Sequence, residues 1–391
     1  MRILIIGAGI SGLAAALGIV NSGHTVSVYE QSPEPRATGG AVTLWNGGVG
    51  ILRWFGVDLA GVGARIDQLE TRSETGEKLY TIDVAHASRR LGHMSLTCPR
   101  RLLQQRITEA LPAGTVHYGH RLAAFTHSGS GVRATFEDGT VAEADMLIGA
   151  DGHRSVVRTS LWGHHPPRLA GWATWQGLSA QRHLLPDPNR GLMINGRLGF
   201  CGLLPAGPDT LQWWFSHPWP GADKGPALPT LRTRFGQWAD PVPLVLKTLQ
   251  EADIEVFPHY THRVPARWGQ GAVTLLGDAA HTMPPIVAQG ANQAVEDAWA
   301  LTVALHESRG RNLPEVLRRF ERSRARRVAP IARLAATEYT YRYHPPAFDR
   351  LIPDGLVTRA YAQWLRTTSG FAGSRAVVPA DLTLSAARAR K

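Results

Sequence analysis

Three glycines close to the N-terminus have the spacing of a loop that binds phosphate. Gly7, Gly9 and Gly12 form a Gly-x-Gly-x-x-Gly motif that includes Ser11, and Glu30 ends the next apolar segment. The first glycine allows a tight turn, the second lets a pyrophosphate approach the backbone, and the third lets a helix pack closely on a strand. The helix N-terminus favours phosphate, and the carboxylate of Glu30 would accept hydrogen bonds from ribose hydroxyls and repel a 2′-phosphate.

The elements that must position these residues are visible in the flanking sequence. A β-branched run at 3–6 predicts a strand, an Ala/Leu-rich run at 13–20 predicts a helix, and 25–29 predicts a second strand. The alternative is a secretory signal peptide, because residues 3–20 contain little besides apolar side chains. Glycine and serine are too frequent in that stretch, and no cleavage site follows it. We therefore favour a dinucleotide-binding strand, loop and helix over a signal peptide or a membrane span.

Two further turns place carboxylates or arginines directly after apolar strands. The run Gly-Ala-Asp-Gly-His-Arg-Ser presents Asp151 with Arg154, and the run Gly-Asp-Ala-Ala-His presents Asp278. Arg100 starts a predicted helix, where a cation opposes the helix dipole and is tolerable beside a phosphate or an electron-rich ring. The other candidates for cofactor contact, in loops and at a helix start, are Arg36, Pro285, Gly290, Ala291 and Asn292.

The composition is that of a soluble globular protein rather than a nucleic-acid-binding one. The chain has 391 residues, 43% of them hydrophobic, and a formal net charge of +11. The arginine-rich run at 318–327 is interpreted as the solvated face of an amphipathic helix, so an anionic cofactor or substrate is the simpler reason for the positive charge. Cys98 and Cys201 make neither a disulfide framework nor metal-ligand spacing, which favours a cytoplasmic location and no metal site.

The strand pattern changes twice along the chain, which predicts an insertion. Buried strands of the parallel type give way to aromatic-rich strands between 170 and 217, separated by Pro/Gly turns as in an antiparallel sheet. The parallel pattern returns at Ala272, and a long arginine-bearing helix is predicted over about 313–339. Beyond Arg342 the composition predicts a loosely attached end.

Together, the three motifs resemble those of the single-component flavin-dependent aromatic hydroxylases, the family of p-hydroxybenzoate hydroxylase. By this resemblance the glycine loop and Glu30 would hold the pyrophosphate and ribose of FAD, and the turn with Asp151 would contact both FAD and NAD(P)H. Asp278 would contact the ribityl chain of FAD, and Arg100 would head a helix against FAD. The resemblance covers roughly residues 1–340.

The resemblance also implies the architecture. We expect an α/β fold, in which a Rossmann-like FAD-binding domain carries an inserted antiparallel β-sheet substrate domain and C-terminal helices follow. The expected FAD-binding segments are 1–70, 98–165 and 268–340, the substrate segments are 71–97 and 166–267, and the C-terminal tail is 341–391.

One departure from the family concerns the loop after Asp278. The family usually has Pro-x-x-Gly-Gln-Gly there, whereas this chain has Ala288 in place of the first of those glycines. Because a methyl group restricts the backbone, we expect Ala288 to have a negative φ.

The activity implied by the resemblance is oxygenation of an aromatic or polycyclic small molecule. NAD(P)H would reduce FAD, O2 would add at flavin C4a, and the resulting hydroperoxide would transfer an oxygen atom to the substrate, while the protein supplies binding and an apolar pocket. Alternatives are flavin epoxidation, Baeyer–Villiger oxygen insertion, and a non-catalytic FAD-binding module.

Four residues of the predicted substrate sheet are candidates for substrate contact. Alternation along the strand at 210–217 puts Gln212 and Trp214 on one face, and we favour these two. His217 and Arg197 are further candidates, as phenol activators or anion anchors.

Overall fold

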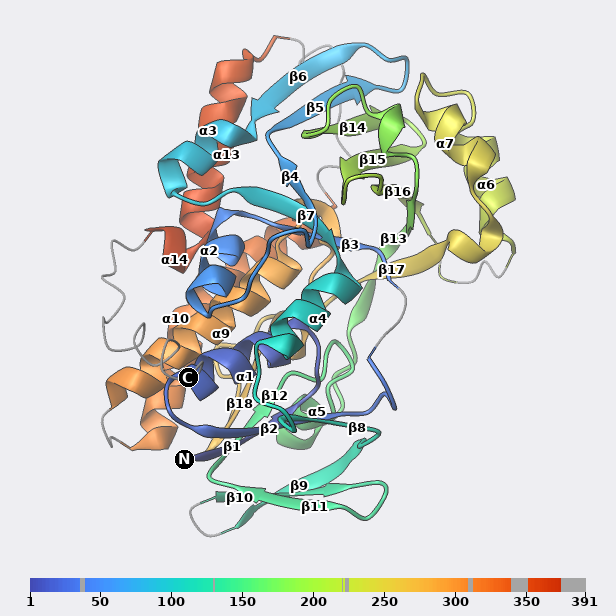
Figure 1. Ribbon diagram of the computed structural model, residues 1–391. Coiled ribbons are helices and arrows are strands. Elements are labelled where there is room, and N and C mark those ends of the chain that lie inside the picture. The colour runs from blue at the N-terminus through green and yellow to red at the C-terminus, as the bar shows by residue number, and fades with distance from the viewer. Residues whose placement is uncertain are drawn as a thin grey trace.

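The protein has an α/β fold with a parallel sheet, a separate and largely antiparallel sheet, and C-terminal helices (Figure 1), as the sequence predicted. The computed structural model describes residues 1–35, 39–128, 131–219, 221, 225–308, 312–338 and 351–373. Arg36 and the predicted helix end at Tyr339 lie outside the described residues.

Five short strands form the parallel sheet. In sheet order they are β18 (Val273–Leu275), β12 (Met146–Gly149), β1 (Arg2–Ile6), β2 (Thr25–Glu30) and β8 (Val116–Tyr118). β1, β12 and β18 are buried along almost their whole length, which explains their apolar sequences. The order places β1 between β12 and β2, so the loops after these strands share one edge of the sheet.

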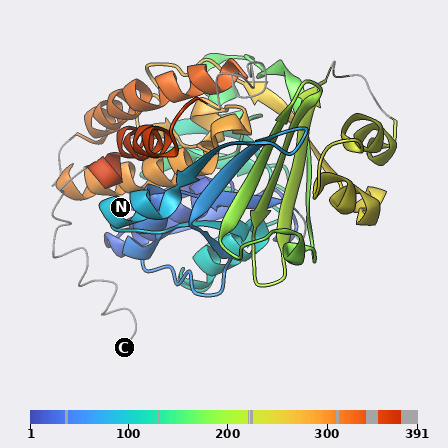
Figure 2. The same ribbon diagram turned by 90° about the horizontal axis from the view of Figure 1, so that it is seen from above.

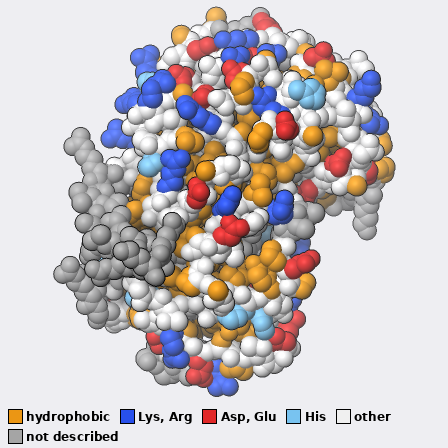
Figure 3. Space-filling model, viewed as in Figure 1, with side chains coloured by type: hydrophobic (Ala, Val, Ile, Leu, Met, Phe, Trp, Pro, Cys, Tyr) orange, Lys and Arg blue, Asp and Glu red, His pale blue; other side chains and the backbone are white. Residues whose placement is uncertain are grey.

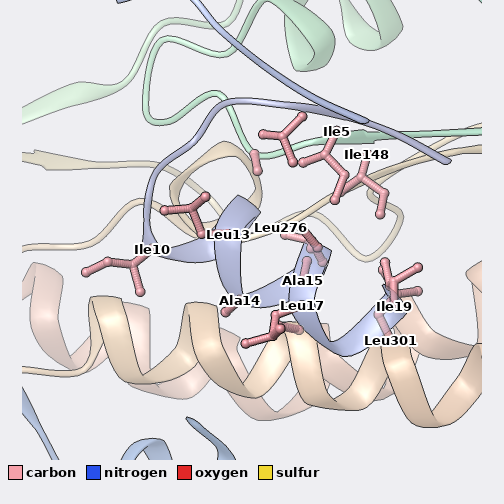
Figure 4. Close-up of a cluster of buried hydrophobic side chains, with 14 of the residues drawn as sticks. Ile5, Ile10, Leu13, Ala14, Ala15, Leu17, Ile19, Ile148, Leu276 and Leu301 are labelled. Atoms are coloured by element: carbon pink, nitrogen blue, oxygen red, sulfur yellow. The ribbon is translucent and has the colours of Figure 1, made fainter. Parts of the chain in front are cut away.

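The main core lies between this sheet and three helices, α1 (Ile10–Asn21), α9 (Gly290–Ser308) and α10 (Leu313–Ala336). Ile5 and Ile148 lie on the sheet side of α1, and Leu13 of α1 belongs to the same cluster (Figure 4). Leu17 points to the other side of α1, toward α9 and its Leu301. Each of these five side chains is at most 2% exposed. Full burial of one such side chain stabilises the fold by about 1.5–3 kcal/mol. This cluster therefore fixes the strand and the helix that flank the glycine loop.

Seven strands form the second large sheet. In order they are β17 (Glu255–Thr261), β13 (Arg168–Ser179), β16 (Leu211–Pro218), β15 (Gly199–Pro205), β14 (Arg190–Gly196), β5 (Gln68–Ser73) and β6 (Lys78–Asp83). All neighbours are antiparallel except β14 and β5, which run parallel. That pair joins segments far apart in sequence, so the sheet is assembled from three parts of the chain.

One face of the seven-stranded sheet is covered by α6 (Ala227–Phe235) and α7 (Val242–Thr248). Seen from above, these two helices lie on the side of the sheet away from the long C-terminal helices (Figure 2). Trp213 and Phe215 of β16 are fully buried in the core cluster that includes Phe235 of α6 and Val245 of α7. The opposite face is therefore the one available for a ligand.

The remaining elements are two small sheets, further helices and three 3₁₀ turns. One small sheet has the order β3 (Ala41–Leu44), β7 (Ser95–Pro99), β4 (Ala64–Ile66), and another has the order β11 (Val141–Ala144), β10 (Gly131–Phe136), β9 (Leu122–Ser128). The other helices are α2 (Asn46–Trp54), α3 (Val84–Leu91), α4 (Arg100–Glu109), α5 (Val156–Trp162), α8 (Asp278–His281), α13 (Asp354–Thr368) and α14 (Gly370–Gly373), with 3₁₀ turns η1 (Arg182–Leu184), η2 (Glu251–Asp253) and η3 (Pro285–Val287).

The C-terminal segment differs from the loosely attached end that composition predicted. Within it, α13 packs against β6 and α3, and its Ala362 and Leu365 are buried. Asp354 accepts hydrogen bonds from Nζ of Lys78 (3.1 Å) and from the backbone N–H of Thr81 (2.9 Å). Average composition does not reveal that one helix in this segment, α13, has an apolar face, and this face packs against the rest of the protein.

Charged side chains of both signs are interspersed on the face shown in Figure 3. Basic groups there alternate with acidic and hydrophobic ones instead of forming one continuous strip. Among the helices of the described residues, none combines the length and apolar character needed to cross a membrane.

Candidate active site

The glycine loop between β1 and α1 has a distinct requirement at each glycine. Gly7 has φ +104°, and a Cβ there would lie 2.5 Å from the carbonyl oxygen of Ala150. A Cβ on Gly12 would lie 2.0 Å from the carbonyl oxygen of Gly7, whereas one on Gly9 would meet nothing within 4 Å. Gly7 and Gly12 are thus needed for packing, and Gly9 leaves its side of the loop open to a ligand.

The start of α1 is suited to an anion. Gly9 is its N-cap, no side chain caps the helix, and no acidic residue stands in its first turn. The hydroxyl of Ser11 is buried and has no hydrogen-bond partner among the described residues. Backbone N–H groups and a buried hydroxyl without a partner fit the pyrophosphate of a dinucleotide.

Glu30 is fixed at the end of β2 by the backbone. Its Oε2 accepts a hydrogen bond from the N–H of Ala8 (2.8 Å), and its Oε1 accepts one from the N–H of Ser32 (2.9 Å). Each oxygen retains a lone pair, and the side chain lines the main cavity. The carboxylate is therefore oriented to accept ribose hydroxyls beside the glycine loop.

The turn after β12 uses Asp151 to hold its own shape. Oδ1 accepts the hydroxyl of Ser155 (2.6 Å) and Oδ2 accepts the N–H of Val157 (3.0 Å). Burial raises the pKa of the Asp151 carboxyl, and these two hydrogen bonds oppose the shift. Arg154 is exposed at the cavity wall.

Arg158, four residues further on, lies behind the cavity wall and has a positioning role that the sequence analysis did not assign. Only 4% of it is exposed, and it donates hydrogen bonds to the carbonyl oxygens of Ala279 (2.8 Å) and His153 (2.7 Å). It thereby ties the turn after β12 to the turn after β18. Nothing in the sequence signals its burial, because a charged residue of an amphipathic helix is ordinarily expected on the solvent face.

The turn after β18 exposes Asp278 and is braced by a buried network. Gly277 has φ +57°, its N–H donates to Oδ2 of Asp297 (2.9 Å), and the exposed Asp278 lines the cavity. Asp297 also accepts Nε2 of His281 (2.6 Å) and Nε of Arg324 (2.6 Å). Because His281 is fully buried in this network and does not line the cavity, its place is structural.

The backbone conformation of Ala288 differs from the one expected. It has φ +47°, the left-handed conformation, rather than the negative φ expected for a residue with a side chain. Its N–H donates to the carbonyl oxygen of Pro285 (2.8 Å), and its carbonyl oxygen accepts Nδ2 of Asn292 (2.8 Å). These two contacts close the turn at the end of η3, and Ala288 is its left-handed C-cap.

Asn292 positions this loop instead of facing a ligand. Its Oδ1 accepts the N–H of Trp45 (2.9 Å) and its Nδ2 donates to the carbonyl oxygen of Thr43 (2.9 Å). Asn292 is therefore the link between the start of α9 and β3, and it is buried behind the cavity wall.

One cavity of about 1610 Å³ joins these turns to the open face of the seven-stranded sheet. The sequence-predicted residues on its wall are Gly7, Gly9, Ser11, Glu30, Arg100, Asp151, Arg154, Asp278, Pro285, Gly290, Ala291, Gln212 and Trp214. Gly12 and Asn292 lie behind the wall. Because loop ends of the parallel sheet and one face of the second sheet meet here, the cavity has two chemically different ends.

Two of the candidate substrate contacts lie away from the cavity. His217 stands on the opposite face of β16, where it stacks on Trp175 with ring centroids 3.9 Å apart, because odd-numbered residues of that strand face α6 and α7. Arg197 is exposed in the hairpin between β14 and β15, and its N–H donates to Glu74 (3.0 Å). Neither side chain lines the cavity.

The sequence analysis also missed two wall residues from α13, Tyr361 and Trp364. The spacing of Thr358, Ala362 and Leu365, all buried, marks an amphipathic helix and was an available signal.

A parallel sheet with a glycine loop, opening into a cavity shared with an aromatic-rich sheet, defines a dinucleotide-dependent oxidoreductase with a separate substrate sheet. A family model described as "FAD binding domain" matches residues 1–335. The chain belongs to this family, that of the FAD-dependent aromatic hydroxylases and monooxygenases, and FAD is its cofactor.

Individual relatives agree with this assignment. The chain is 30% identical over 384 residues to an FAD-dependent urate hydroxylase of Klebsiella oxytoca, covering 95% of this chain and 96% of that protein. It is 32% identical over 360 residues to a 3-amino-4-hydroxybenzoate 2-monooxygenase of Streptomyces cremeus, covering 90% of each. The crystal structure of Klebsiella pneumoniae HpxO complexed with FAD and uric acid superposes with a TM-score of 0.82 at 27% identity, covering 98% of this chain and 97% of that one.

Proposed function

We propose that this FAD-dependent monooxygenase uses NAD(P)H and O2 to hydroxylate an aromatic small molecule. The observation that carries the proposal is the single cavity that runs from the glycine loop to the aromatic side of the seven-stranded sheet. The relatives named as urate hydroxylase and 3-amino-4-hydroxybenzoate 2-monooxygenase support hydroxylation of a ring. The balance is one substrate C–H, one NAD(P)H, one proton and one O2, giving the hydroxylated ring, NAD(P)+ and water.

The residues at the parallel-sheet end of the cavity would hold FAD. Gly9 and the start of α1 would bind the pyrophosphate, Glu30 the ribose, and Asp278 the ribityl chain. Bound FAD would supply the redox chemistry, by accepting a hydride from NAD(P)H and activating O2. Arg100 and Arg154, both on the cavity wall, would offset the negative charge of FAD and of NAD(P)H.

The other end of the cavity would orient the substrate and exclude water. The aromatic side chains there, among them Phe200, Trp214 and Trp364, provide an apolar wall. We propose the same division at the level of segments, with FAD held by 1–70, 98–165 and 268–340 and substrate by 71–97 and 166–267. A cytoplasmic location would supply the NAD(P)H.

The test is stopped-flow absorbance of the purified holoprotein mixed with NADPH or NADH and then with O2, with and without phenolic and polycyclic aromatics. Faster flavin reduction with a ligand, followed by incorporation of one ¹⁸O atom from ¹⁸O2 as a ring hydroxyl, supports the proposal. An epoxide or a ring-expanded lactone would identify epoxidation or Baeyer–Villiger insertion instead. If no ligand produces NAD(P)H oxidation, the protein is a non-catalytic FAD-binding module.

A further inference from the structure

The substrate end of the cavity has a flat aromatic floor. Met193 of β14 pairs with Thr71 of β5 and with Gly202 of β15. Gly202 pairs in turn with Trp214 of β16, and a Cβ on Gly202 would lie 2.0 Å from an indole carbon of Trp214. The indole therefore lies directly over the Gly202 backbone, which only glycine permits, and Phe200 stands beside it with ring centroids 6.2 Å apart.

The opposite wall comes from α13 and from the residue before α2. Tyr361 and Trp364 of α13 belong to the same apolar cluster as Trp214 and Met193, and so does Trp45. The rings of Tyr361 and Trp45 meet edge to face, with centroids 5.7 Å apart and an interplanar angle of 84°. A flat ring between this wall and the Trp214 floor would contact aromatic surface on both sides.

Three polar groups on the cavity wall carry buried atoms without a hydrogen-bond partner among the described residues. They are Oε1 of Gln212, Oδ1 of Asn195 and the hydroxyl of Tyr361. Nε2 of Gln212 donates to the carbonyl oxygen of Ala41 (3.3 Å), which leaves Oε1 as an acceptor for a ligand. Burial raises the pKa of the Tyr361 phenol well above its ordinary value, so this group is neutral and able to donate.

Charge is absent from this end of the cavity. Among the described residues that β5, β6, β14, β15, β16 and α13 contribute to the wall, none carries an ionisable acid or base other than the tyrosines. The arginines of the wall, Arg100, Arg101, Arg121 and Arg154, belong to the parallel-sheet end, and the charged wall residue of β17 is Glu255. A substrate carboxylate placed against Trp214 would lose its hydration without gaining a cation.

We propose that the substrate is an uncharged, flat aromatic compound that presents an O–H or N–H donor, such as a neutral phenol or a lactam, to Oε1 of Gln212. This inference rests on the proposed function and narrows its substrate class. It separates this chain from the relative whose named substrate, 3-amino-4-hydroxybenzoate, carries a carboxylate.

The test compares three probes in titrations of the FAD-loaded protein, followed by the change in flavin absorbance. The probes are 2-naphthol, 2-methoxynaphthalene, which lacks the donor, and 6-hydroxy-2-naphthoate, which keeps the hydroxyl free and adds a carboxylate. We expect 2-naphthol to bind at least tenfold more tightly than either of the others. Equal or tighter binding of the naphthoate, equal binding of the methoxy compound, or no binding of 2-naphthol would overturn the inference.

Two variants test whether residues at the substrate end of the cavity cause the preference for an uncharged donor. Gln212→Leu is expected to weaken 2-naphthol about tenfold and to leave 2-methoxynaphthalene unchanged, and an equal effect on both probes would contradict the role of Oε1. Met193→Arg is expected to improve binding of the naphthoate at least tenfold, and no improvement would count against the charge argument. Because binding is read without turnover, a probe that binds as expected but gives no NAD(P)H-dependent oxygen incorporation would count against the proposed function alone.

Discussion

The guanidinium of Arg158 donates a hydrogen bond to the carbonyl oxygen of Ala279 across 2.8 Å, and this contact joins two motifs that are far apart in the sequence. A second hydrogen bond, to the carbonyl oxygen of His153 (2.7 Å), starts from the other terminal nitrogen of the same side chain. The turn carrying Asp151 and the turn carrying Asp278 are thereby held at a fixed separation. Both turns line the parallel-sheet end of the cavity, where we propose that FAD binds.

Replacing Arg158 by lysine is expected to destabilise the protein by about 1–3 kcal/mol. A single ammonium cannot reach both carbonyl oxygens, and an unsatisfied buried carbonyl costs free energy of that order. Urea unfolding of the FAD-free protein measures the change. Arg154→Lys, at an exposed position in the same turn, is the control and is expected to stay within about 0.5 kcal/mol of the wild type. Equal urea midpoints for Arg158→Lys and the wild type would show that the contact is not structural.

The second prediction separates two glycines of the loop. Gly9→Ala is expected to leave the unfolding free energy of the FAD-free protein nearly unchanged, because the new methyl group meets nothing within 4 Å. It is expected to weaken FAD binding at least tenfold, because that methyl group enters the space of the pyrophosphate. Isothermal titration with FAD measures the affinity.

Gly12→Ala is the matched control for Gly9→Ala. Its methyl group would lie 2.0 Å from the carbonyl oxygen of Gly7, so the backbone must shift and the FAD-free protein itself loses stability. If Gly9→Ala bound FAD as tightly as the wild type, the open side of the loop would not be the pyrophosphate site.

Local motifs made the geometry of the glycine loop and of the turns around it predictable, and their contacts with FAD remain a prediction. The roles of Gly7, Gly12 and Glu30 depend on neighbours within a strand, a turn and a helix, and the sequence carries all of those neighbours. The substrate end depends on pairing between distant segments. The placement of Met193 beside Thr71 results from the parallel pair of β14 and β5, for which neither strand alone gives a signal.

Helical periodicity and backbone conformation account for the other differences. Tyr361 was missed because average composition hid the amphipathic face of α13. The positive φ of Ala288 could not be predicted, because alanine ordinarily avoids that conformation. The sequence favoured the face of β16 with Gln212 and Trp214, and these residues lie on the cavity wall because α6 and α7 cover the other face.

The third prediction concerns the strain at Ala288. Alanine in the left-handed conformation costs about 1–2 kcal/mol, and Ala288→Gly removes that cost while adding about 0.4–1 kcal/mol of chain entropy in the unfolded state. The variant is therefore expected to be as stable as the wild type or more stable by about 1 kcal/mol, as measured by urea unfolding. Ala360→Gly, at an exposed position in α13, is the control and is expected to lose about 1 kcal/mol. An equal loss in both variants would mean that Ala288 is unstrained.

The fourth prediction is a pH dependence that originates at Asp297. Burial alone would raise the pKa of this carboxyl, but the neighbouring His281 and Arg324 outweigh burial and hold the pKa below its ordinary value of 3.8. As the pH falls below 3.8, the unfolded chain binds a proton at this residue before the folded protein does. The stabilisation by Asp297 is therefore complete above that pH and is lost as the pH falls through the lower folded-state pKa.

Asp297→Asn tests this dependence. At pH 7 the variant is expected to be about 3–5 kcal/mol less stable than the wild type, because the buried guanidinium of Arg324 loses its counter-charge. The difference is expected to shrink as the pH is lowered below 3.8, and urea unfolding of both proteins across the acidic range measures it. Asp209→Asn, at an exposed position, is the control and is expected to show no such difference at pH 7. The lowered pKa would not belong to Asp297 if the difference in unfolding free energy between Asp297→Asn and the wild type stayed constant down to the lowest pH at which both fold.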